Sequence, residues 1–381
     1  MTSKMVSLFA GIGGFELAFK KVGVETSLMC EIDPIAKQVL KANLPNIPIV
    51  DDVCSLKSIP QDVEILCAGF PCQDLSSVGV KKGLSGHRSS LIREVFRLLR
   101  KKRVEWVLLE NVSFMLRLNQ GETIQTIVNE LEDLGYKWAY RTIDSISFVP
   151  QHRCRVFIVA SLHNDPRNVI LSNDSLKSLE KPDLKNFSQA LGFYWTEGRY
   201  ALGLTLNALP TLKSGSTIGI PSPPAIAFPN GEISIPDVRD AERLQGFPKN
   251  WTLPAEKIAK SSSRWKLIGN AVTVDVVSWI ARKMFNPQEY DYQNDEEMLN
   301  GSIWPKAAWG GNGKRYISNA STIPIWKKKV NLQDFLKFPR KKLSLKASLG
   351  FKNRLEKGNM HCPDYFRDAL DNHIKMMENI K

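Results

Sequence analysis

The stretch Met5-Val6-Ser7-Leu8-Phe9-Ala10-Gly11-Ile12-Gly13-Gly14 decides how the fold begins. Its first residues are mostly apolar and predict a buried strand, while the amphipathic pattern from Phe15 to Val22 predicts a helix. The glycines between them would let a ligand approach the backbone beside the amino end of that helix. The spacing is not G-x-G-x-x-G, so it favours an adenosyl ligand without a pyrophosphate over NAD.

Strands and helices continue to alternate up to about residue 160. Helices are predicted at Ile35–Asn43, Leu91–Lys102 and Thr123–Leu134, and strands at Ser27–Cys30, Ile47–Val50, Ile65–Ala68, Trp106–Leu109, Trp138–Ile143 and Arg155–Ala160. This alternation predicts a doubly wound parallel sheet, in which ligands bind at the carboxyl ends of the strands. Glu31 ends the second strand and Asp52 follows the third, where acids hydrogen-bond a ribose. The glycine turn and the two acids together predict a nucleoside-bearing cofactor.

A single thiol lies on a proline-stiffened turn, Phe70-Pro71-Cys72-Gln73, directly after the apolar run 63–69. A thiol at a strand end can act as a nucleophile where its pKa is lowered and its approach is held rigid. Glu110, in Glu110-Asn111-Val112, ends another strand and should lie near Cys72. A carboxyl group there could protonate or hydrogen-bond a ring nitrogen while the thiol attacks. In isolation, a cysteine is more often a packing residue and a glutamate a surface charge.

Two arginines precede the apolar run 156–160. Alternate positions of a strand face one way, so Gln151, Arg153 and Arg155 are predicted to share a face. Near a thiol and a carboxyl group, two arginines can steady anionic or carbonyl groups, whereas alone they would suit an edge strand with solvated charges. Two later segments, 239–248 and 269–272, are uninformative by themselves.

The chain of 381 residues carries a formal net charge of +13, which favours a polyanionic partner, nucleic acid above all. The excess is uneven, because residues 306–357 hold fourteen Lys and Arg against two acids. The six cysteines include no CxxC pair, so we expect a reducing compartment, no disulfides and no metal. No apolar run approaches the roughly 20 residues of a membrane span, and no secretory signal is recognisable, so we expect a cytoplasmic protein without a membrane partner.

The pattern changes after about residue 160. Residues 161–236 are rich in Pro, Gly, Ser and Asn, which predicts a small irregular domain. Helices are predicted at Asp237–Leu244, Val272–Met284 and near Tyr365–Met377, and 287–300 is typical of a linker. The final segment is basic and contains Trp304, Trp309 and Trp326, a mixture that suits further DNA contact. The alternative is a folded appendage that only packs.

Taken in order, these pieces resemble the DNA cytosine-5 methyltransferase family of bacterial and phage restriction–modification systems. The matching segments are Phe9-Ala10-Gly11-Ile12-Gly13-Gly14, Glu31, Asp52-Val53, Gly69-Phe70-Pro71-Cys72-Gln73, Glu110-Asn111-Val112, Pro150-Gln151-His152-Arg153-Cys154-Arg155, 239–248 and Gly269-Asn270-Ala271-Val272. The resemblance implies an α/β fold with a doubly wound mixed sheet, the core of S-adenosylmethionine-dependent methyltransferases. It also implies a catalytic and cofactor-binding domain at 1–160, a small target-recognition domain at 161–258, a helix at 259–286 that returns to the catalytic domain, and a basic C-terminal extension at 287–381.

The same resemblance implies methyl transfer from S-adenosylmethionine to C5 of a cytosine flipped out of duplex DNA. Cys72 would add to C6, Glu110 would engage N3 and the exocyclic amine, and Arg155 would hold the O2 side with support from Arg153. The residues implied to enclose the cofactor are Phe9, Gly11, Gly13, Gly14, Glu31, Ile32, Asp52, Val53, Gln73, Leu91 and Asn270. The residues implied to contact DNA are Lys81, Lys82, Arg88, Thr211 and Arg239.

Two departures and two alternatives accompany this interpretation. Asp74-Leu75-Ser76 follows the thiol loop where Phe-Ser is commoner at the last two positions, and Val78 replaces a small polar residue of many relatives. A tRNA cytosine-5 methyltransferase shares the core but usually carries a Pro-Pro-Cys-Gln loop. A non-catalytic DNA-binding homologue would not need Cys72, Glu110 and Arg155 together. We therefore expect double-stranded DNA as the partner, a monomer, and a cognate restriction endonuclease that acts separately.

Overall fold

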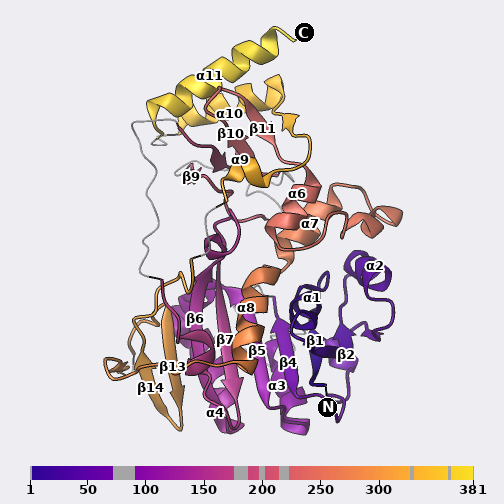
Figure 1. Cartoon of the computed structure of the whole chain (residues 1–381), viewed down its shortest axis with the longest axis vertical. Coiled ribbons are helices and arrows are strands. Elements are labelled where there is room, and N and C mark those ends of the chain that lie inside the picture. Colours follow the sequence, from indigo (N-terminus) through magenta and orange to yellow (C-terminus); the bar gives the residue numbers. More distant parts are fainter. Residues whose placement is uncertain are drawn as a thin grey trace, which may run out of the picture. The chain divides into compact units, whose positions relative to one another are not determined.

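The computed structural model describes residues 2–71, 91–175, 188–196, 202–213, 223–299, 301–326, 330–358 and 362–380. The chain forms two compact units (Figure 1). The first unit comprises Met1–Asp144, Cys154–Leu176 and Val272–Ile325, and the second comprises Ser145–Arg153, Lys177–Ala271 and Trp326–Lys381. Within the described residues, no helix combines the length and the apolar character that crossing a bilayer requires.

A sheet of ten described strands runs through the first unit. The strands are β1 (Lys4–Leu8), β2 (Glu25–Cys30), β3 (Ile49–Val50), β4 (Ile65–Gly69), β5 (Trp106–Val112), β6 (Lys137–Asp144), β7 (Cys154–Ser161), β12 (Glu296–Glu297), β13 (Ala307–Gly311) and β14 (Lys314–Ile317). Their order is β12-β14-β13-β6-β7-β5-β4-β1-β2-β3. Strands β1 to β5 pair in parallel, whereas β7 is antiparallel to β5 and β6 and the remaining strands continue antiparallel. The predicted α/β fold with a mixed sheet is confirmed.

The helices of the first unit cover this sheet and bury its apolar residues. They are α1 (Gly14–Lys20), α2 (Pro34–Asn43), α3 (Ile92–Lys101), α4 (Glu122–Asp133), α5 (Arg167–Ile170) and α8 (Val274–Phe285). Helix α1 packs against α8, and α4 lies beside β6. Side chains of β1, β4 and β5 form one apolar core with α3 and α4, as expected for strands that are covered on both faces. The four helices predicted up to residue 134 are present, with ends within about two residues of the expected positions.

The expected linker and the start of the expected appendage contribute the strands β12, β13 and β14 to the first sheet. Strand β13 pairs with β6, and β12 pairs with β14. Tyr290, inside the expected linker, shares hydrogen bonds with Asp295 (3.0 Å) and Ser318 (2.6 Å). Trp304 is 6% exposed and packs against Trp138, with ring centroids 6.2 Å apart. The interpretation of Trp304 as a DNA contact is wrong, because its ring lies in the core.

The second unit is built on a five-stranded antiparallel sheet in the order β15-β11-β10-β8-β9. Its strands are β8 (Leu191–Phe193), β9 (Thr205–Leu206), β10 (Ala225–Ala227), β11 (Ile233–Ile235) and β15 (Lys341–Lys342), and its helices are α6 (Val238–Leu244), α7 (Ser263–Asn270), α9 (Leu332–Phe335), α10 (Leu345–Lys357) and α11 (Asp364–Glu378). The ring of Phe193 lies 5.3 Å from that of Phe351 and 5.0 Å from that of Phe366. Helices α10 and α11 therefore share the apolar core of this sheet.

The two units divide the chain differently from the domains expected from sequence. The expected extension 287–381 is split, because its first part completes the sheet of the first unit and its last part completes the sheet of the second. The expected returning segment 259–286 is split too, since α7 belongs to the second unit and α8 to the first. Long-range strand pairing decides both divisions, and such pairing leaves no local sequence pattern.

Candidate active site

The carboxyl ends of β5, β4, β1 and β2 lie along one edge of the first sheet, because these neighbouring strands run parallel. The segments that follow them carry most of the predicted site residues. Cys72, Gln73, Lys81, Lys82 and Arg88 lie outside the described residues. Leu91 is described; it packs, partly buried, against the core just before α3.

The glycine turn after β1 has a backbone that few side chains allow. Phe9, Gly11 and Gly13 have positive φ angles of 57°, 57° and 90°, and Gly13 caps the amino end of α1. Glycine adopts such angles without steric cost. A Cβ atom added to Gly11 would meet nothing within 4 Å. Open space therefore borders the turn at Gly11, where a ligand can approach the backbone.

Glu31 links this turn to the end of β2. Its side chain accepts hydrogen bonds from the backbone N–H groups of Gly11 (2.7 Å) and Asp33 (2.8 Å). Burial raises the pKa of the Glu31 carboxyl group, and hydrogen bonds from backbone N–H groups, Gly11 and Asp33 among them, oppose that rise. A carboxylate offers about four lone-pair sites, more than these backbone N–H groups occupy, so it can still accept from a hydroxyl group of a ligand. Ile32, which is 68% exposed, adds an apolar surface beside them.

Arg97 of α3 holds the turn after β3, although no sequence pattern pointed to it. Asp52 caps the short 3₁₀ turn Val53–Ser55 at this place. The guanidinium group of Arg97 donates to the carbonyl oxygens of Val53 (3.0 Å) and Leu56 (2.9 Å). The helix that follows Leu91 is thus joined to the Asp52 turn. In the sequence, Arg97 is indistinguishable from a solvated charge on an amphipathic helix.

Glu110 and Arg155 form an ion pair near the carboxyl end of β5. The Oε1 atom of Glu110 lies 3.2 Å from Nε of Arg155, and the two side chains are 10% and 15% exposed. Gly69 of β4 is the register partner of Glu110, and a Cβ atom there would lie 3.3 Å from Oε2 of the carboxylate. Glycine at this position makes room for the carboxylate. A carboxyl group oriented by a guanidinium group is suited to hydrogen-bond a planar ring that carries both donors and acceptors.

Asn111 fixes the point at which the chain leaves β4 toward Cys72. It is 3% exposed, its Nδ2 donates to the carbonyl oxygen of Phe70 (3.0 Å), and its Oδ1 accepts from the N–H of Val112 (2.8 Å). Phe70 is itself buried. The backbone two residues before Cys72 is therefore attached to the strand that carries Glu110.

Gln151, Arg153 and Arg155 do not share a strand face, contrary to the prediction. β7 begins after Arg153, so Gln151 and Arg153 precede the strand and belong to the second unit. Arg153 is 2% exposed, and its guanidinium group donates to the carbonyl oxygens of Leu212 (3.2 Å) and Ala271 (2.8 Å). The strand face could not form because the chain turns into the second unit before it reaches Arg153.

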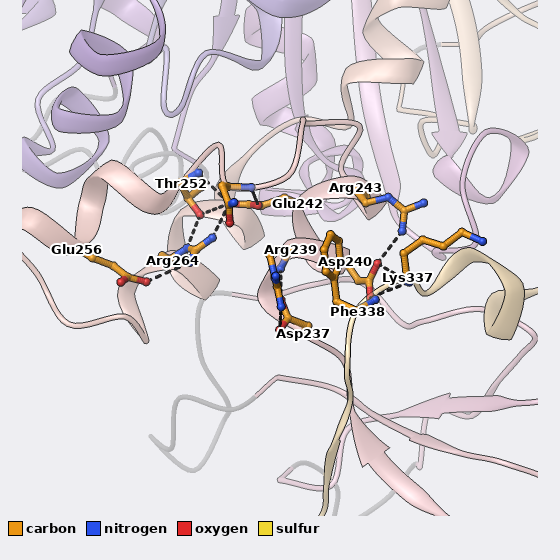
Figure 2. A network of polar contacts seen from close by, with 11 residues as sticks. Asp237, Arg239, Asp240, Glu242, Arg243, Thr252, Glu256, Arg264, Lys337 and Phe338 are labelled. Carbon is orange, nitrogen blue, oxygen red and sulfur yellow. Dashed lines mark hydrogen bonds and ion pairs between the residues drawn. The ribbon is translucent and has the colours of Figure 1, made fainter.

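Thr211, Arg239 and Asn270 also belong to the second unit. The Thr211 hydroxyl donates to a backbone carbonyl 2.8 Å away. Figure 2 shows Arg239 paired with Asp237, at 2.8 and 3.0 Å, while the guanidinium carbon lies 4.1 Å from the centroid of the Phe338 ring. Asn270 ends α7 and is exposed. These contacts lie within the second unit and show how its own chain is held.

The fold and the site at the strand edge define a class of enzyme. A solved structure of Spodoptera frugiperda DNMT2 matches 74% of this chain and 100% of its own, with a TM-score of 0.54 at 17% identity. The S. pombe Dnmt2 methyltransferase matches 74% of this chain and 99% of its own, with a TM-score of 0.53 at 16% identity. This likeness shows the fold, a mixed α/β core that the chain shares with these two proteins.

The sequence comparisons narrow the class to one family. The C-5 cytosine-specific DNA methylase family model matches residues 3–211 and 237–286. The chain is 42% identical over 380 residues to the type II methyltransferase M2.BsuMI of Bacillus subtilis (strain 168), and the match covers 97% of each. It is 30% identical over 299 residues to M.MspI of Moraxella sp, covering 74% of this chain and 70% of that protein. The chain belongs to the C-5 cytosine-specific DNA methylase family and is a DNA cytosine-5 methyltransferase.

Proposed function

We propose that the enzyme methylates C5 of a cytosine flipped out of a short duplex sequence, through a transient bond between Cys72 and C6 of the base. The observation that carries this proposal is the Glu110–Arg155 pair beside Gly69. It places an oriented carboxyl group next to the strand end from which the chain continues to Cys72.

The strand ends on the other side of β4 fit S-adenosylmethionine as the methyl donor. Glu31 has lone pairs left for ribose hydroxyl groups, Ile32 offers an apolar surface for the adenine, and the turn at Gly11 is open. The sulfonium group of the cofactor supplies an activated methyl group. The remaining residues of the proposed cofactor site are Phe9, Gly13, Gly14, Asp52, Val53, Gln73, Leu91 and Asn270.

The chain's own groups act on the base. The Cys72 thiolate adds to C6, and Glu110 engages N3 and the exocyclic amine so that the ring accepts the electron pair. Arg155 orients Glu110 and holds the O2 side of the ring, while Arg153 supports the neighbouring segment. The electron pair then makes C5 nucleophilic, and C5 takes the methyl group. A base removes the C5 proton, and the electrons of that bond expel the Cys72 thiolate.

The proposed setting is a restriction–modification system, because the relatives are type II methyltransferases. Methylation would protect host DNA at sites that a separate cognate endonuclease cuts. We expect the enzyme to act as a monomer in the cytoplasm of a bacterial or phage-infected cell. The proposed DNA contacts are Lys81, Lys82, Arg88, Thr211 and Arg239.

Methyl transfer to duplex DNA and to tRNA tests the proposal. We expect labelled methyl groups on duplex DNA alone, and no turnover by Cys72→Ala although that variant still binds the cofactor. Transfer to tRNA instead, or turnover near the wild-type rate by Cys72→Ala, would contradict it. Bisulfite sequencing of DNA from cells that express the protein would then identify the modified base and its sequence context.

A further inference from the structure

The C-terminal residues complete the second unit rather than trailing from it. β15 pairs with β11 at one edge of the five-stranded sheet, and helix α11 contacts β10 and β11. Helices α10 and α11 place Phe351 and Phe366 in the apolar core of the same sheet. The basic residues of this segment are therefore mounted on a folded surface.

Helix α6 fixes the backbone that leads into β15, as Figure 2 shows. The buried carboxylate of Asp240 accepts hydrogen bonds from the N–H groups of Lys337 (3.0 Å) and Phe338 (3.1 Å). Arg243 donates to the carbonyl oxygen of Phe335 (2.6 Å). Helix α6 is itself held, because the buried side chain of Glu242 pairs with Arg264 at 2.9 Å. The backbone of segment 335–338 is therefore held in place by hydrogen bonds to α6.

Lys337, Lys341 and Lys346 form an exposed group on and beside β15, called here the basic strip. None of their ammonium groups lies within 4 Å of a described carboxylate, and Asp334 is the one acid in residues 331–346. Lys352 on the next helix behaves differently, since it pairs with Asp371 at 2.7 Å. In Figure 2 the Lys337 side chain extends away from the Asp240 carboxylate.

We propose that the basic strip binds backbone phosphates of duplex DNA, an inference that rests on the proposed function. Three uncompensated ammonium groups on a fixed backbone match a partner that carries regularly spaced negative charges. Such contacts position a recognition unit on DNA and carry no sequence information themselves. The competing explanation is that lysines on an edge strand only prevent pairing with another chain.

Deleting the C-terminal segment is not a suitable test, because the deletion would remove β15 and expose the core of the second unit. Replacing the three exposed lysines is milder. The test variant is Lys337→Ala/Lys341→Ala/Lys346→Ala, and the charge-preserving variant replaces the same three lysines with arginine. The matched control, Lys20→Ala/Lys41→Ala/Lys57→Ala, removes equal charge from exposed positions of the first unit that also have no described carboxylate within 4 Å.

Binding of the full chain to a labelled mixed-sequence duplex is measured by fluorescence anisotropy between about 50 and about 200 mM salt. We expect the alanine variant to lower the slope of log affinity against log salt by about 2 to 3, roughly one unit for each lost phosphate contact. The arginine variant and the first-unit control should keep the wild-type slope.

A wild-type slope in the alanine variant would contradict the proposal that the basic strip binds phosphates. If that variant also self-associates, the lysines instead prevent β15 from pairing with another chain. The slope is read from binding alone, so it tests the strip independently of catalysis. A wild-type protein that transfers no methyl group to DNA would contradict the proposed function, not this inference.

Discussion

At the residue scale, the site depends on which side chains are held by their neighbours. Glu110 lies beside Gly69 and is paired with Arg155, so both of its carboxylate oxygens have a close neighbour. Asn111, the next residue, donates a hydrogen bond to the carbonyl oxygen of Phe70, just after the end of β4. Adjacent residues of β5 thus carry the proposed catalytic carboxyl group and hold the backbone of Phe70.

Glu110→Gln is expected to lower kcat by about 10² to 10⁴, because the amide cannot supply the proton and charge that the carboxyl group supplies at N3. Its cofactor affinity should stay close to that of the wild type. Single-turnover kinetics and titration calorimetry measure the two quantities. Glu130→Gln, a change on the surface of α4, serves as the control. A near-normal rate in Glu110→Gln would remove the carboxyl group from the mechanism.

Arg97→Ala is expected to raise the Kd for S-adenosylmethionine roughly tenfold, about 1.4 kcal/mol, since it removes two hydrogen bonds that hold the Asp52 turn and so weakens the site indirectly. Arg97→Lys should recover part of the affinity, because a lysine can reach one of the carbonyl groups. Arg100→Ala, on the exposed face of the same helix, is the matched control. Equal affinity in the alanine variants of Arg97 and Arg100 would show that the contact does not position the turn.

At the element scale, the strands that follow local patterns were predictable and the others were not. The run from Met5 to Gly14 predicts a strand, a turn and the start of a helix, because these three elements differ in composition. The structure has all three. β13 pairs with β6, although more than 160 residues of chain separate the two strands. Neither sequence indicates which strand it will pair with. β9 and β15 have two residues each, too few for a periodic pattern. Arg97 escaped notice for a similar reason, since two of its partners are backbone carbonyls far away in the sequence.

Trp304→Ala is expected to destabilise the first unit by about 3 to 5 kcal/mol, the usual cost of removing a large buried aromatic side chain. Its ring packs against Trp138 and Tyr140 under the edge where β13 joins β6. Urea unfolding followed by tryptophan fluorescence measures the change. The neighbouring Ile303, which is 84% exposed, provides the control substitution Ile303→Ala. Similar midpoints for the two variants would contradict the assignment of Trp304 to the core.

At the scale of the whole molecule, the last helix stabilises the second unit through a buried histidine. Nδ1 of His373 accepts a hydrogen bond from the N–H of Ile233 (3.1 Å), and Nε2 donates to the carbonyl oxygen of Leu343 (2.8 Å). This arrangement requires a neutral ring with its proton on Nε2. Burial lowers the pKa of His373 from its ordinary value of 6.5. The C-terminal segment and the sheet are therefore joined by a contact that depends on pH.

The second unit is expected to lose stability as the pH falls below the ordinary histidine pKa of about 6.5. The folded-state pKa of His373 is lowered, so its contribution is complete above the unfolded value and is lost as the pH falls through the folded value. His373→Gln should flatten this dependence, since an amide can replace both hydrogen bonds without titrating. His163→Gln, at an exposed position, is the control. An identical pH profile for wild type and His373→Gln would rule out the histidine as its source.

The division of the molecule also explains why the sequence interpretation placed the basic C-terminal residues outside the enzyme core. The segments that match the family end near residue 285, and beyond that point only the composition could be used to predict the domain organisation. The structure instead uses β12, β13 and β14 to complete one sheet and β15 to complete the other. Because this strand pairing leaves no local sequence pattern, composition alone could not show that the C-terminal residues belong to two units.

The central claim is a covalent bond between Cys72 and an extruded cytosine, and one trapping experiment tests it directly. The full-length protein is incubated with S-adenosylmethionine and a duplex that carries 5-fluorocytosine at the methylated position, where fluorine prevents the release step. We predict an adduct that survives denaturation and whose mass equals that of the protein plus the methylated strand. Peptide mapping should locate the bond to DNA at Cys72, and Cys72→Ala should form no adduct. Methylation of ordinary DNA by a protein that never yields this adduct would contradict the mechanism.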